Sequence, residues 1–222
     1  MMHSREILES IPMPERIKNL PRDPERGYPV PFFVASVNGK PDFRIADEQK
    51  RIRCVKERLC WICGERLGRY LVFVIGPMCA INRISAEPPM HRDCAEYSVR
   101  VCPFLLNPNQ KRNPKSVGAE AEELLLEPPG VMVARNPGCM LVWVTTGYRI
   151  VRDQVDRVLF GVGPPVKLAW IAEGRSATRA EVLESIETGL PLLRELAEKD
   201  GPAAIGALNS QLARAIQLIP IE

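Results

Sequence analysis

Two pairs of residues with the chemistry of metal ligands stand out in the chain. Cys60 and Cys63 lie three positions apart in the run Cys-Trp-Ile-Cys-Gly, and His91 and Cys94 repeat this spacing. Two thiolates at that spacing converge on one ion in a tight turn, and one helical turn brings positions i and i+3 to the same face. Three thiolates and one imidazole suit zinc, so the sequence predicts one bound Zn²⁺ ion.

The predicted ligand set indicates a structural ion. Four protein ligands complete a tetrahedron and leave no position for a reactive water. The only histidine besides His91 is His3, so a nuclease that needs a further catalytic histidine is disfavoured. Cys79 could replace one of the four ligands. We expect Cys54, which faces away from the predicted buried stripe of its helix, and Cys139, which lies in a turn, to take no part.

Residues of about 58–103 resemble the treble-clef class of zinc modules. The resemblance rests on the run from Cys60 to Gly64, the strand-like segment after it, and the His91–Cys94 pair at an expected helix start. It implies a knuckle, a hairpin, and a helix whose first turn donates the last two ligands. The 27 residues between the pairs (64–90) leave room for a hairpin and an additional loop. Treble clefs occur in ribosomal proteins, nucleases, transcription factors and enzymes, so the resemblance specifies a metal site and no single function.

Other chemistry-bearing residues form two groups. A polar set either lines a pocket or braces a long loop, and consists of Asp42, Arg44, Asn82, Arg83 and Glu87. A second set is purely basic and has no acidic neighbour between positions 99 and 116: Arg100, Lys111, Arg112 and Lys115. The run Gly161-Val162-Gly163-Pro164-Pro165 is not a phosphate loop, because it lacks the lysine and the following helix.

The elements that must position the ligand pairs have clear local signals. Residues 32–37 and 41–45 are strand-like around Asn38-Gly39, a dipeptide typical of tight hairpin turns. Asp47 is an expected N-cap for a helix over 48–59. A strand over 69–75 and a helix over 91–102 complete this part of the chain.

The second half reads as strands followed by helices. We expect strands over 131–135, 140–146, 158–162 and 166–172. Thr178 and Glu181 form a capping-box pattern that opens an amphipathic helix, and a last helix covers roughly 203–218. The predicted fold class is α+β, with small antiparallel sheets, a treble-clef-like zinc module and two C-terminal helices.

The composition restricts the class of protein to which the chain can belong. The 222 residues are 45% hydrophobic and 26% charged, which is ordinary for a globular protein, and the net charge of +3 does not by itself imply nucleic acid. No run approaches the roughly 18 apolar residues that span a bilayer. No secretory signal is evident, so we expect a cytoplasmic protein without a membrane partner, in which seven cysteines serve as metal ligands or free thiols.

These observations predict three regions: 1–105 with the arm, hairpin and zinc module, a linker or exposed loop over 106–130, and strands with helices over 131–222. The first and third regions could pack as one domain. The leading functional hypothesis is a zinc-stabilised binding protein that contacts protein or nucleic acid. The alternative is an enzyme that uses the polar set named above as its pocket, with zinc in a structural role only.

Overall fold

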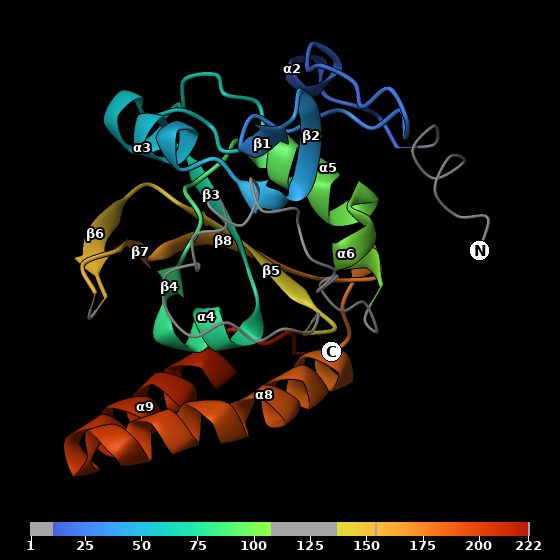
Figure 1. The fold of residues 1–222 in the computed structure, drawn as a ribbon. Coiled ribbons are helices and arrows are strands. Elements are labelled where there is room, and N and C mark those ends of the chain that lie inside the picture. The colour runs from blue at the N-terminus through green and yellow to red at the C-terminus, as the bar shows by residue number, and fades with distance from the viewer. Residues whose placement is uncertain (1–10, 108–136, 154, 222) are drawn as a thin grey trace.

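A computed structural model of the chain describes residues 11–107, 137–153 and 155–221. Seven helices and nine strands lie within these ranges (Figure 1). Before residue 108 they are α2 (Glu15–Lys18), β1 (Val34–Val37), β2 (Lys40–Ala46), α3 (Glu48–Glu57), β3 (Leu71–Ile75), α4 (Pro77–Asn82), β4 (Ile84–Ser85), α5 (Arg92–Val101) and α6 (Pro103–Leu106). After residue 136 they are β5 (Met140–Thr145), β6 (Tyr148–Arg152), β7 (Val158–Val162), β8 (Pro165–Ala172), β9 (Arg175–Ser176), α8 (Arg179–Asp200) and α9 (Pro202–Ile216).

The strands form three antiparallel sheets, in the orders β1-β2, β3-β5-β8-β9 and β4-β7-β6. The predicted mixture of helices and small antiparallel sheets is therefore confirmed. In both larger sheets a strand from the first half of the chain pairs with a strand from the second half, β3 with β5 and β4 with β7. The two predicted end regions thus share their sheets, and the expected linker lies almost entirely outside the described residues.

Strands β3 and β5 of the four-stranded sheet are covered on both faces, since their successive side chains point to opposite sides and nearly all of them are buried. One face carries Phe73, Leu141, Trp143 and Trp170, which pack with buried residues of α4, α8 and α9. The other face, which includes Val72, Val142 and Val144, packs against the segments that carry the predicted metal ligands. Figure 1 shows the same arrangement, with α8 and α9 at one end of the molecule and α3, α5 and the β1–β2 hairpin at the other.

Several local signals act as predicted. Asn38 and Gly39 have φ angles of 51° and 75°, so they form the tight turn between β1 and β2. The Asp47 side chain accepts a hydrogen bond from the Lys50 amide and caps α3. Thr178 and Glu181 form the complete capping box at the start of α8.

Other expectations were wrong or incomplete. Cys54 is only 2% exposed, because α3 turns Cys54 and Arg51 inward, and Arg51 reaches the carbonyl oxygens of Ala86 and Val158. The helix α4 and the strand β6 were not predicted. The predicted strand over 131–135 lies outside the described residues. None of the helices in the described ranges is both long and apolar enough to cross a membrane.

Candidate metal centre

The first ligand pair lies in a tight knuckle just after α3. The Cys60 amide donates to the Glu65 carbonyl at 2.7 Å, and the Gly64 amide donates to the Cys60 carbonyl at 2.9 Å. Gly64 has a φ angle of +76°, a conformation that side-chain-bearing residues rarely adopt. A Cβ atom there would lie 2.7 Å from the Phe32 ring. Both observations require glycine at this position.

The second pair is held at the start of α5. His91 is the N-cap residue and Cys94 lies in the first turn of the helix. Met90, just before His91, exchanges two backbone hydrogen bonds with Val72 of β3, at 2.8 and 3.0 Å. The Trp61 amide, inside the knuckle, donates to the Pro89 carbonyl at 3.2 Å. The backbone thus joins the second pair both to the sheet and to the first pair.

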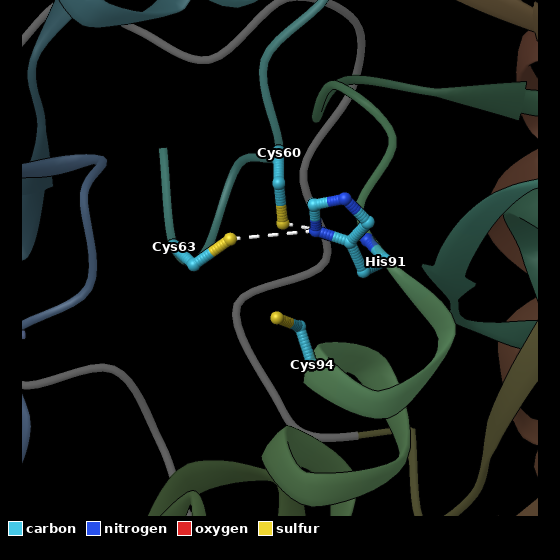
Figure 2. Close-up of side chains that lie close together, drawn as sticks. All are labelled: Cys60, Cys63, His91 and Cys94. Carbon is cyan, nitrogen blue, oxygen red and sulfur yellow. Dashed lines mark hydrogen bonds between the residues drawn. The ribbon is translucent and has the colours of Figure 1, made fainter. Parts of the chain in front are cut away.

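The structure brings Cys60, Cys63, His91 and Cys94 together, with their ligand atoms all within 4.8 Å of one another. Figure 2 shows the three sulfur atoms and the imidazole ring around a common centre. In a tetrahedral zinc site, zinc–sulfur bonds of about 2.3 Å place the sulfur atoms roughly 3.8 Å apart. The four residues therefore fit a metal ion after only small side-chain adjustments.

The orientation of the His91 ring identifies which nitrogen faces the centre. Its Nδ1 atom lies 3.4 Å from the Cys63 sulfur, while Nε2 lies 3.1 Å from the Arg66 carbonyl oxygen. A carbonyl only accepts, so Nε2 carries the proton and donates it there. Nδ1 is then left with its lone pair toward the sulfur atoms, as in metal-bound histidines whose second nitrogen donates to a carbonyl.

The thiols perturb one another strongly. Burial disfavours the thiolate of Cys60, yet hydrogen bonds from Cys63 and Cys94 lower the pKa of Cys60 to about 3. Hydrogen bonding to Cys60 and Cys63, followed by burial, raises the pKa of Cys94. One sulfur therefore holds negative charge at the expense of its neighbour, because adjacent thiolates repel in a buried site. A divalent cation at the centre would stabilise all three thiolates together.

A residue that the sequence did not single out braces the site. The Arg16 guanidinium of α2 lies 3.2 Å from the Asp93 carboxylate and 3.8 Å from that of Glu65. Asp93 lies between the ligands of the second pair, and Glu65 follows the first. The adjacent Ile17 is almost fully buried in the same cluster as the thiols. The role of Arg16 could not be predicted from a local sequence pattern, because its partners are distant in sequence.

The remaining candidates lie elsewhere. Cys79 is exposed on α4 and is not part of the cluster, so it does not replace a ligand. Cys54 and Cys139 are buried outside the cluster. Arg100 is exposed near the end of α5, whereas Lys111, Arg112 and Lys115 lie outside the described residues.

The predicted polar pocket does not form as a unit. Arg44 pairs with Asp42 within β2, with Nε 2.9 Å from the carboxylate. Asn82 and Arg83 line a cavity beside α4 that neither Asp42, Arg44 nor Glu87 reaches. The hairpin and α4 are well separated in Figure 1. The five residues therefore cannot act on one ligand in this arrangement.

Comparisons of the chain with protein-family models, with curated proteins and with solved structures found no match. The functional argument consequently rests on the chemistry of the site.

Proposed function

We propose that the chain is a zinc-stabilised binding protein that contacts protein or nucleic acid. The observation that supports it best is the convergence of three thiols and one imidazole from two separate segments. Thiolate and imidazole donors with tetrahedral spacing favour zinc over hard cations such as magnesium or calcium, which prefer oxygen ligands.

The closed ligand set supports a structural rather than a catalytic ion. Four protein donors leave no open position for water or substrate. Cys60 and Cys94 are both 0% exposed, so these two thiols are shielded from solvent, while Cys63 and His91 are partly exposed. Bound zinc would join the knuckle to α5 and so hold one layer of the protein against the central sheet.

The treble-clef resemblance is supported by the order of the parts. A knuckle supplies the first pair, β3 follows, and the start of α5 supplies the second pair. The return strand is reduced to the Val72–Met90 pair, while β3 pairs along its whole length with β5. On this proposal the module is a treble-clef-like unit whose strand β3 pairs with a strand from the second half of the chain.

Metal analysis of the purified protein tests the zinc centre. We expect about one zinc per chain, and Cys94→Ser should lose the metal and lower the melting temperature, because metal binding energy contributes directly to folding. Cys79→Ser is the matched control, since Cys79 is exposed and lies outside the cluster. The proposal would be refuted if removing all metal from the wild-type protein left its melting temperature unchanged. Zinc loss in the Cys79 variant would also refute it.

The sequence supports nucleic acid as the partner, because Lys111, Arg112 and Lys115 belong to a set of basic residues without acidic neighbours. Replacing these three residues with alanine should weaken oligonucleotide binding. It should also reduce the slope of log affinity against log salt by roughly three units, if each contacts a phosphate. Gel-shift titrations with DNA and RNA at two salt concentrations measure both effects.

The control for that experiment makes the same change in net charge at three exposed lysines of the described residues, Lys40, Lys56 and Lys167. This control variant should retain binding. Equal losses in the two triple variants would mean a diffuse charge effect. The absence of binding to any oligonucleotide at low salt would leave a protein as the proposed partner.

A further inference from the structure

A cavity of about 610 Å³ lies away from the metal centre. Its walls come from the end of α4, the turn between β5 and β6, the start of β6, the end of β7 with the residues that follow, and the last turns of α9. The volume falls within the range of small-molecule sites in proteins. The cavity is thus large enough for an organic molecule rather than a bare ion.

Three arginines from three different elements line this cavity: Arg83 after α4, Arg149 of β6 and Arg214 of α9. Among the residues that the structure describes, no aspartate or glutamate lines it. Within the described part of the chain, none of the three guanidinium groups forms an ion pair. Three like charges around one hollow create a positive potential that attracts anions.

The fold holds these arginines in place. The Arg83 guanidinium lies 5.5 Å from the centre of the Trp143 ring, which is fully buried, and the Arg83 carbonyl accepts a hydrogen bond from the Val162 amide at 2.8 Å. Arg214 uses Nε to donate to the Ser210 carbonyl at 3.2 Å. Its terminal nitrogens bind no other described residue, so they remain available to a ligand.

The two glycines of the Gly161-Val162-Gly163 run contribute because they have no side chain. Gly161 lies directly opposite Arg149 in the β6–β7 pairing. A Cβ atom on Gly161 would lie 2.7 Å from both Cγ and Nε of Arg149. The glycine therefore allows the Arg149 side chain to lie across β7 beside the cavity. A Cβ atom on Gly163 would collide with the Gly147 carbonyl oxygen, so this second glycine lets the β5–β6 turn approach closely.

We infer that this cavity binds a small organic molecule through a phosphate or diphosphate group. Guanidinium groups present planar, paired donors that match phosphate oxygens, and they remain charged at any physiological pH. Three of them suit a multiply charged phosphate better than a single carboxylate. The side-chain amides of Asn82 and Gln211 also line the cavity and can contact the remainder of the ligand.

Calorimetric titration of the zinc-loaded 222-residue chain with pyrophosphate tests the inference. We expect saturable one-to-one binding. Arg149→Gln and Arg214→Gln should each weaken it by about tenfold or more, because each removes a charge-assisted hydrogen bond. The matched control is Arg194→Gln on α8, which removes the same charge from an exposed residue outside the cavity. The control should bind pyrophosphate as the wild type does.

A second variant tests the geometry without changing any charge. Gly161→Ala should displace the Arg149 side chain and weaken pyrophosphate binding while the melting curve remains cooperative. Unchanged affinity in this variant would overturn the placement of Arg149 in the site.

Three results would overturn the inference as a whole. They are no binding of pyrophosphate, an equal loss in the Arg194 control, and tighter binding of a single-stranded oligonucleotide that depends on Arg149 and Arg214. The last result would assign the arginines to a nucleic-acid surface instead.

Discussion

At the scale of single residues, the clustering of Cys60, Cys63, His91 and Cys94 was predictable because each pair is local. Two donors three positions apart meet through one turn of backbone, whatever the rest of the chain does. The surroundings of the ligands were not predictable in this way. Arg16 reaches Asp93, and the Phe32 ring packs on Gly64, across distances in sequence that no spacing rule covers. The three cavity arginines are likewise brought together only by the fold.

Gly64 gives the sharpest test at this scale. Gly64→Ala should destabilise the protein through two effects. The left-handed backbone costs an alanine about 1–2 kcal/mol, and the collision with the Phe32 ring adds an overpacking cost of roughly 1–3 kcal/mol. Because the glycine follows Cys63 directly, zinc affinity should fall as well. Chemical denaturation and competition with a chelator measure the two losses.

Gly39→Ala is the matched control for that variant. Gly39 has nearly the same φ angle, +75°, but a Cβ atom there would meet nothing within 4 Å. It should therefore lose only the backbone contribution and keep its zinc affinity. Equal destabilisation of the two variants would show that Phe32 yields without cost and that the knuckle tolerates a side chain.

At the scale of elements, helices and turns were predicted correctly where the local sequence signal was strong. The Asn38-Gly39 turn, the Asp47 cap and the capping box of α8 were predicted because each stabilises its element through neighbours in sequence. The helix α4 was missed because Gly76-Pro77, which follows the strand predicted over 69–75, is also typical of the end of a strand. Pro77 is in fact the first residue of α4, a position where the missing amide costs nothing.

The buried face of α9 shows a different limit. The spacing of Ile205, Leu208 and Ile216 in the sequence favours one shared inner side of this helix, yet Ile205 and Ile216 are exposed. Leu208 is buried, as this spacing predicts, and Ala215 is buried as well. Ala215 lies in the same core as buried residues of α4 and α8. Hydrophobicity alone does not reveal this, because the packing partner decides which face fits.

At the scale of the whole molecule, the sequence predicted the mixture of elements but not how the two halves combine. β3 and β5 are separated by more than sixty residues of chain, yet they are paired along their full length. Such pairing depends on complementary surfaces rather than on periodicity. Its consequence is that one sheet supports two cores, one with the thiols and one with α8 and α9.

This division leads to a prediction for metal removal. The buried residues of α8 and α9 belong to the core with Phe73 and Trp143, whereas Cys60, Cys63 and Cys94 belong to the opposite core. Removing zinc with a chelator should therefore increase amide hydrogen exchange most strongly in residues 58–67 and 90–101. Exchange in α8 should change least, because regions open according to their own local contacts.

Hydrogen exchange followed by mass spectrometry, with and without the chelator, measures the pattern. Thr178→Ala provides the opposite perturbation, since losing this cap should destabilise α8 by about 1 kcal/mol and leave the knuckle protected. Equal loss of protection in both cores after chelation would mean that the shared sheet makes the chain a single cooperative unit. No loss in the knuckle and α5 would mean that the four side chains pack without help from a metal.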